Sequence, residues 1–268
     1  MDLMEAIEAR HAVRAYTERA IEPAKAQILQ RLIDKANDES GLKIQLCLES
    51  PAAFDSILAK YGVFTKVRNY IALVGNKSDK AALACGYHGE KLVLAAQKLG
   101  LNTCWVGGTY SKRKVVAQVG LREKLHLVIA LGYGETQGSP HKTKSIEELS
   151  HVSGEMPEWF RAAMEAVRLA PTAINQQRFL FTLEPAHRDE ESEGGIPGAA
   201  DGAEGEAGQG RKPEDKGNGE AAPVACDKVR AEALRGLYAH VDLGIARYHF
   251  EVGAAAAGHA LGTDWQWA

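Results

Sequence analysis

The sequence predicts a mixed fold of helices and strands, arranged in α+β or α/β layers, and two observations support this prediction. Apolar residues recur at helical spacing in some segments and at every second position in others, and the two kinds of segment alternate along the chain. A chain of 268 residues with 45% hydrophobic residues is also long enough to bury a substantial core.

The first half of the chain carries the clearer periodicity. Its second helix is introduced by Pro23 and has one apolar face, and its third helix ends at Gly100, a residue favoured just after a helix. In chain order we expect a helix at about 2–10, a helix from 23 that ends at 37–41, a strand at 42–48, a strand at 70–75, a helix at 81–99, a short apolar segment at 105–106 before Gly107-Gly108, and a strand at 127–131.

The second half starts near Met156 and repeats this order in weaker form. A helix at 159–170 leads into a strand at 179–183, folded sequence resumes at Lys228, and residues 242–265 partly echo residues 86–105. We therefore predict an internal duplication, with half-domains at 1–152 and 153–268 that reproduce a dimer within one chain. Residues 187–224 have almost no large apolar side chain and predict a flexible, low-complexity insertion in the second half.

Charge and cysteine content exclude several classes of function. With 32 basic and 35 acidic residues, the chain offers no broad positive field for nucleic acid or an anionic membrane. No signal peptide and no apolar run long enough to span a membrane is visible, so we expect a cytoplasmic protein. The 4 cysteines lie far apart with no metal-type pairing, which predicts reduced thiols and no metal site.

A basic cluster follows the first helix. Arg10, His11 and Arg14 place two guanidiniums and an imidazole within a few residues of one another. Guanidinium groups match phosphate oxygens, so this cluster is a candidate site for a phosphorylated ligand. The structural alternative is a set of solvated side chains at the end of an amphipathic helix.

A polar turn follows the helix at 159–170. Thr172, Asn175 and Gln177 offer hydroxyl and amide groups that both donate and accept hydrogen bonds, which suits the mixed edge of a flavin ring and its ribityl hydroxyls. The alternative is an ordinary helix stop followed by a loop.

Two glycine-containing segments follow strands. Gly107-Gly108 leaves the backbone free to approach a flat ligand, with its amide protons facing a ring nitrogen that gains electron density on reduction, although alone it is a generic turn. The segment 131–135 has the wrong glycine spacing for a dinucleotide fingerprint, so we infer no Rossmann site. Lys142 and Lys144 add positive charge after it, and a solvated loop explains them equally well.

Together these segments resemble the nitroreductase superfamily of FMN enzymes, in the single-chain pseudo-dimer type of bacteria and archaea. Residues 10–14 resemble the family's Arg-rich phosphate element, residues 170–177 its Ala-Pro-Ser-x-x-Asn-x-Gln element, and residues 100–108 its Gly-Leu-x-Thr-x-Trp segment. The strand and tail at 127–149 resemble its closing strand and basic tail. Here Ala12 stands where the family usually has serine, and Arg178-Phe179 where it has Pro-Trp.

The resemblance implies an α+β nitroreductase-like fold, with mixed antiparallel sheets packed against helices. It implies that Arg10, His11, Arg14, Gly107, Gly108, Lys142, Lys144, Thr172, Asn175 and Gln177 bind one FMN, with flavin N5 near the backbone of Gly107 and Gly108 and with no catalytic side chain assigned. Since the family's Ala-Pro-Ser element lies here in the second half, the chain is expected to act as a monomer.

The implied activity is ping-pong hydride transfer from NADH or NADPH through FMN to a small oxidised acceptor. Three alternatives stay open. One is a flavin-binding protein without turnover, such as a sensor, a carrier or a degenerate paralogue. The second is a flavin-dependent dehalogenase or dehydrogenase on the same fold. The third is a structural or partner-binding protein with an empty cleft.

Overall fold

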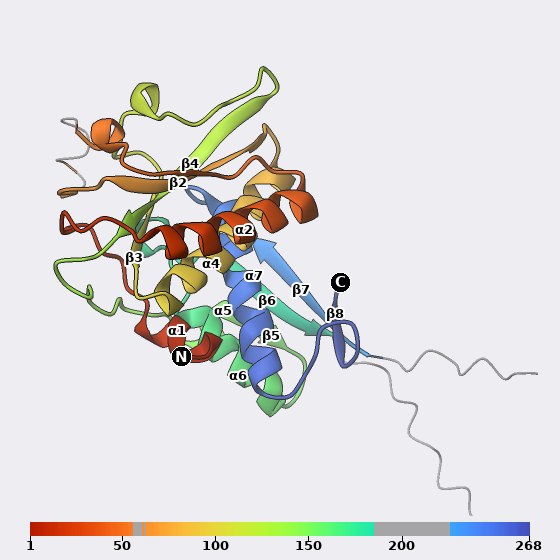
Figure 1. The fold of residues 1–268 in the computed structure, drawn as a ribbon. Helices are drawn as coiled ribbons and strands as arrows, with labels where there is room; N and C mark the ends of the chain where they lie inside the picture. The colour runs from red at the N-terminus through yellow and green to blue at the C-terminus, as the bar shows by residue number, and fades with distance from the viewer. Residues whose placement is uncertain (56–60, 62, 185–225) are drawn as a thin grey trace, which may run out of the picture.

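The fold was described from a computed structural model of the chain (Figure 1). The structure describes residues 1–55, 61, 63–184 and 226–268. The predicted insertion at 187–224 lies outside the described residues.

The first-half segments form helices and strands close to those expected. Asp2 caps the first helix in a reciprocal capping box with Glu5, Pro23 occupies the first turn of the second helix, and Gly41 ends that helix with a φ of 68°. In chain order the elements are α1 (Leu3–Ala9), α2 (Pro23–Ser40), β1 (Gln45–Cys47), β2 (Asn69–Asn76), α4 (Asp79–Lys98), β3 (Asn102–Val106) and β4 (Glu123–Gly132).

These strands form a sheet in the order β1-β2-β4-β3, with every neighbouring pair antiparallel. The strand expected at 42–48 is shorter in the structure, where the regularly paired residues run from Gln45 to Cys47. The Asn37 side chain accepts a hydrogen bond from the Ile44 N–H at 2.7 Å and donates one to the Ile44 carbonyl at 3.0 Å. Lys43 N–H also donates to the Val74 carbonyl at 2.8 Å, so the chain already contacts β2 before the regular strand begins.

The second half builds another four-stranded sheet, in the order β5-β6-β7-β8. Its central pair β6-β7 is antiparallel, whereas β5 joins β6 and β8 joins β7 in parallel. The sequence did not predict β5, which lies at the end of the segment assigned to the first half-domain. The elements are α5 (Ile146–Leu149), β5 (Ser150–Val152), α6 (Glu158–Arg168), β6 (Phe179–Glu184), β7 (Asp227–Ala233), α7 (Ala239–Ala256) and β8 (Trp265–Trp267).

Helices α4 and α7 lie between the two sheets (Figure 1) and pack against each other through glycines. A Cβ atom on Gly86 would overlap the Val241 carbonyl, and one on Gly244 would overlap the Leu83 carbonyl. The two helix backbones can approach this closely because neither glycine has a side chain.

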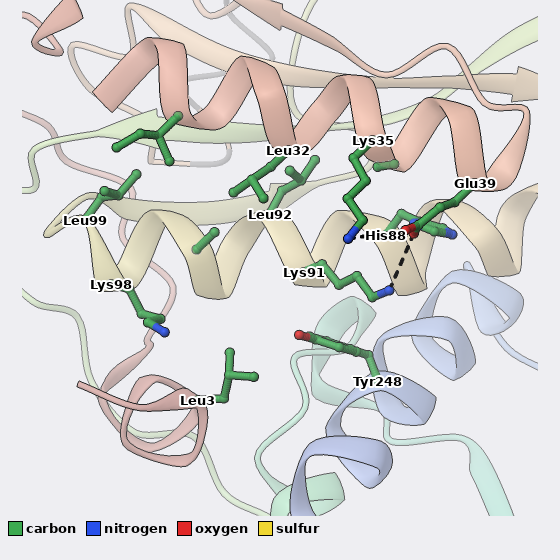
Figure 2. Close-up of a pocket in the computed structure, with 13 residues that line it drawn as sticks. Leu3, Leu32, Lys35, Glu39, His88, Lys91, Leu92, Lys98, Leu99 and Tyr248 are labelled. Carbon is green, nitrogen blue, oxygen red and sulfur yellow. Dashed lines mark ion pairs between the residues drawn. The ribbon is translucent and has the colours of Figure 1, made fainter. Parts of the chain in front are cut away.

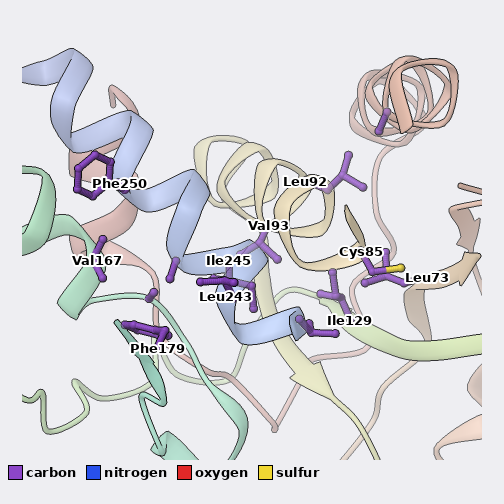
Figure 3. Close-up of a cluster of buried hydrophobic side chains, with 14 of the residues drawn as sticks. Leu73, Cys85, Leu92, Val93, Ile129, Val167, Phe179, Leu243, Ile245 and Phe250 are labelled. Atoms are coloured by element: carbon purple, nitrogen blue, oxygen red, sulfur yellow. The ribbon is translucent and has the colours of Figure 1, made fainter. Parts of the chain in front are cut away.

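One continuous cluster of buried hydrophobic side chains spans both sheets. In Figure 3 it runs from Leu73 and Ile129 of the first sheet, past Leu243 and Ile245 of α7, to Phe179 of the second sheet. Burial of this surface is the main favourable term that holds the two halves together.

The order helix, strand, strand, helix, strand occurs twice, as α2-β1-β2-α4-β3 and as α6-β6-β7-α7-β8. The pairing of the strands differs between the sheets, because every pair in the first sheet is antiparallel whereas both outer pairs of the second sheet are parallel. Among the described residues, none of the helices combines the length and apolar character needed to cross a lipid bilayer.

Candidate active site

A cavity of about 530 Å³ lies where the two halves meet. Its walls come from the segment after α1, the turn after β3, the turn after α6 and the start of α7. The lining residues are Arg10, Ala12, Arg14, Cys104, Trp105, Val106, Gly107, Gly108, Thr109, Leu127, Pro171, Thr172, Ala173, Ile174, Leu237, Tyr238, Val241, Asp242 and Ile245. The volume and the mixture of apolar walls with a few polar groups are typical of a small-molecule or cofactor site.

Two arginines from the predicted basic cluster line this cavity. Arg10 is 4% exposed, and its Nε atom is buried without a hydrogen-bond partner among the residues that the structure describes. Arg14 is exposed and pairs with no acidic side chain in the described part of the chain. Two guanidiniums with free donors at one cavity fit an anionic group such as a phosphate.

Arg10 lies beside the buried carboxylate of Glu90, a residue of α4. Glu90 Oε1 lies 3.8 Å from Arg10 Nε and 3.0 Å from His249 Nε2, and Glu90 Oε2 accepts a hydrogen bond from Trp105 Nε1 at 2.9 Å. The other ring nitrogen of His249 lies 2.9 Å from the Ala166 carbonyl, so it carries a proton.

Glu90 and His249 are each 0% exposed. Burial alone would raise the pKa of Glu90, but the hydrogen bonds from His249 and Trp105 and the charge of Arg10 together hold that pKa below its ordinary value. Burial lowers the pKa of Arg10, and the negative charge of Glu90 opposes this shift. The network thus joins α4 to α7 and seats Arg10 at the cavity wall.

The polar turn after α6 forms the opposite wall. Thr172 and Ile174 line the cavity, and Ile174, Asn175 and Gln177 all have positive φ angles of 48°, 55° and 43°. A β-branched residue such as Ile174 is strained in this region, and strain of this kind concentrates at functional sites. Ile174 is nevertheless 85% exposed, so its side chain forms an apolar edge of the cavity.

Asp242 of α7 fixes this turn. Its carboxylate accepts hydrogen bonds from the Ala173 N–H at 3.0 Å and from Gln176 Nε2 at 2.8 Å. It is 3% exposed, and burial raises its pKa to about 6, although both hydrogen bonds act in the opposite direction. A carboxyl group that can change its protonation state near neutral pH therefore lines the cavity.

This raised pKa predicts a pH-dependent stability. The folded chain holds the Asp242 proton more tightly than the unfolded chain does, so the contribution of this group is fully present below about pH 4 and is lost as the pH rises through about 6. The advantage of wild type over Asp242→Asn in urea unfolding should fall by on the order of 2–3 kcal/mol between pH 4 and 7.5. An advantage that stays constant over this range would contradict the shift.

Four predicted residues lie outside the cavity lining and join the first-half tail to the second-half turn. Asn175 Nδ2 donates to the Lys142 carbonyl at 2.8 Å, and Lys144 Nζ donates to the Gln177 carbonyl at 2.9 Å. Buried Gln177 accepts from the Lys144 N–H and donates to the Arg168 carbonyl, and its own N–H donates to Thr172 Oγ1 at 3.1 Å. In this structure these side chains support the turn that carries Thr172.

His11 is half-buried beside Arg10 and does not line the cavity. Burial and the neighbouring charge of Arg10 lower the pKa of His11, which favours the neutral ring. Of the ten predicted binding residues, the structure therefore places Arg10, Arg14, Gly107, Gly108 and Thr172 around one cavity. Arg14 shares that cavity with Thr172 and with Ile174, which is the residue directly before Asn175 in the chain.

Sequence reasoning missed the residues that support the cavity from within. Asp242 is a lone acid in the apolar run 241–246, a pattern that signals a buried carboxylate. Glu90 lies in a helix beside polar residues and looks like part of a solvated face. Tyr238 gave no signal, because its role depends on a contact with a residue 131 positions away.

A second hollow of about 410 Å³ lies between α1, α2, α4 and α7 and contains none of the predicted residues (Figure 2). Leu32, Leu92 and Leu99 line it, while Lys35 and Lys91 pair with Glu39 at 3.7 and 3.8 Å (Figure 2). Exposed pairs of this kind contribute about 0–1 kcal/mol each. Glu39 is therefore a useful contrast to the buried Glu90.

Comparison with solved structures identifies the fold. A protein from Thermotoga maritima described as a "putative nitroreductase" aligns with a TM-score of 0.56 and 19% identity, over 97% of this chain and 87% of that one. A nitroreductase from Desulfovibrio desulfuricans, solved in complex with FMN, aligns with a TM-score of 0.44 and 18% identity over 59% of this chain and 99% of its own. A nitroreductase family protein from Streptococcus pneumoniae has a TM-score of 0.44 and 17% identity, with coverage of 55% and 98%. No curated protein matches the chain.

The α+β assembly of two sheets around paired central helices is thus the nitroreductase fold. The family model described as "Putative TM nitroreductase" matches residues 2–196, which is well over half of the chain. The chain belongs to this family, as its motifs predict.

Proposed function

We propose that this chain is an FMN-dependent oxidoreductase that transfers hydride from NADH or NADPH to a small oxidised acceptor by a ping-pong mechanism. The observation that carries the proposal is the cavity in which Arg10 and Arg14 face Gly107-Gly108 and the turn at Thr172. Family membership and the FMN-bound relative from Desulfovibrio support the choice of cofactor.

The residues present fit FMN. Arg10 and Arg14 would hold the phosphate, and Thr172 would meet polar atoms of the cofactor. Val106, Val241 and Ile245 provide apolar wall against which a flat ring can pack. When bound, FMN would supply the two-electron redox chemistry, while the protein binds and orients the reactants.

The other predicted residues have a supporting role in this proposal. Hydrogen bonds link the turn after α6 to the tail after β4 through Asn175, Gln177, Lys142 and Lys144. His11 is the chain neighbour of Arg10 and lies outside the cavity lining. Asp242 fixes the backbone of the turn from the second half. Because the cavity draws Arg10 and Gly107 from one half and Thr172 from the other, neither half alone would complete it.

We also propose that residues 1–152 and 153–268 are two related half-domains and that the monomer is the active form. The repeated element order and the shared core support this arrangement. Among the described residues that line the cavity, both arginines come from the first half. The proposal therefore gives one flavin per chain.

A visible absorption spectrum and a sedimentation run test both proposals together. Purified chain incubated with FMN and desalted should show a flavin spectrum with about one FMN per chain, and it should sediment as a monomer. Stopped-flow mixing with NADH or NADPH should bleach that spectrum. Chain that retains no FMN would refute the cofactor, bound flavin that stays oxidised with both nucleotides would favour a carrier or sensor, and two symmetric flavins in a homodimer would refute the fusion.

A further inference from the structure

Tyr238 precedes α7 at the cavity wall and has an unusual backbone conformation. Its φ and ψ are 55° and 25°, in the left-handed region that large side chains rarely adopt. Such a conformation is strained and persists only where its surroundings hold it in place. The contacts that hold Tyr238 therefore indicate what the residue does.

Those contacts are with the glycine turn of the first half. The Tyr238 hydroxyl donates a hydrogen bond to the Gly107 carbonyl at 2.7 Å. The ring packs against Gly107 so closely that a Cβ atom there would overlap it. Burial raises the pKa of Tyr238, so its hydroxyl keeps its proton at neutral pH and remains a donor.

Anchoring the Gly107 carbonyl also fixes the next amide. In a planar trans peptide the Gly107 C=O and the Gly108 N–H point in opposite directions, so the bond from Tyr238 sets the direction of the Gly108 N–H. A glycine pair could otherwise rotate this peptide at little cost. Gly108 lines the cavity, and its N–H has no acceptor among residues 1–55, 61, 63–184 and 226–268.

We propose that Tyr238 is a positioning residue that holds the Gly108 N–H toward the redox centre of a cofactor bound in the cavity. This inference rests on the proposed function, in which that donor faces the ring nitrogen that gains electron density on reduction. The second half then sets the redox behaviour of a cofactor whose phosphate is bound by the first half.

The test compares wild type with Tyr238→Phe in flavin-loaded full-length protein. The variant keeps the ring and loses only the hydroxyl, so FMN affinity should stay within about threefold of wild type. The rate of flavin reduction should fall roughly tenfold, and the reduction equilibrium should also shift roughly tenfold, which lowers the two-electron midpoint potential by about 30 mV. Gly107→Ala should give the same phenotype, because its new Cβ atom would displace the Tyr238 ring.

Tyr110→Phe is the matched control. Tyr110 lies three residues from Gly107, and its buried hydroxyl has no hydrogen-bond partner in the described ranges of the chain, so its removal should change neither the rate nor the potential. A readout independent of the flavin comes from chain labelled with ¹⁵N-glycine. The Gly108 amide signal should be single in the wild type and broadened or doubled in Tyr238→Phe.

Two results are separately decisive. A flavin-loaded Tyr238→Phe protein with wild-type rate, potential and Gly108 signal would overturn the role of Tyr238 and leave the proposed function intact. Wild-type chain that takes up no FMN would overturn the proposed function, and the inference about Tyr238 with it.

Discussion

Replacing Glu90 by glutamine is expected to lower the free energy of unfolding by about 3–5 kcal/mol, the largest effect on stability that we predict. Glutamine keeps the shape of the side chain but removes the negative charge that Arg10 and His249 face. Both groups are buried, so neither can recover its hydration without opening the core. Urea denaturation should show the loss directly, and the melting temperature should fall by about 10 °C.

Glu39→Gln is the control for this experiment. Glu39 is 41% exposed and pairs with Lys35 and Lys91 on the surface (Figure 2), so its replacement should change stability by no more than about 1 kcal/mol. If both variants lost the same small amount, the network around Glu90 would not be holding α4 and α7 together.

The second large effect concerns cofactor affinity. Arg14→Ala should raise the dissociation constant for FMN by about tenfold, because a charge-assisted contact to phosphate is worth roughly 1.5–3 kcal/mol and the exposed position of Arg14 places it at the lower end. Titration of FMN-free chain, followed by flavin fluorescence, measures this constant. Added salt should weaken binding more in the wild type than in the variant, since salt screens the charge that the variant lacks.

Arg19→Ala provides the matched control for Arg14. Arg19 is also an exposed arginine near the start of the chain, but it pairs with Glu22 and lies over the Tyr133 ring at 4.0 Å, outside the cavity. FMN affinity should therefore stay within about twofold of wild type. Equal losses in both variants would indicate a general charge effect, and no loss in Arg14→Ala would place the phosphate elsewhere.

Local patterns in the sequence predicted most elements of the fold. Helices such as α2 and α4 have apolar faces and clear end signals at Pro23, Gly41 and Gly100, and β2 and β4 are apolar runs of strand length. The start of β1 was misplaced, because regular pairing begins at Gln45, three residues later than the alternation of apolar residues indicated. β5 was not predicted because three residues carry too little periodicity to be recognised.

The candidate site divides in the same way. The residue types at Arg10, Arg14, Gly107 and Thr172 were readable because each lies in a short motif, and the structure brings all four to one cavity. The residues that hold these four in place could not be predicted from the sequence. Glu90, His249, Asp242 and Tyr238 each have at least one hydrogen-bond partner that lies 69 or more positions away in the chain, and a single sequence contains no signal for such pairs.

By itself, the sequence determined the class of fold, the family and the chemical types of group available for binding, because these depend on periodicity and on short motifs. Only the tertiary structure decided which of those groups share a cavity and which support it from behind. The physical reason is that a side chain acquires its burial and its hydrogen-bond partners only when α4 and α7 pack across the two halves. Burial and partners in turn determine which charged groups are free to bind a ligand in the cavity.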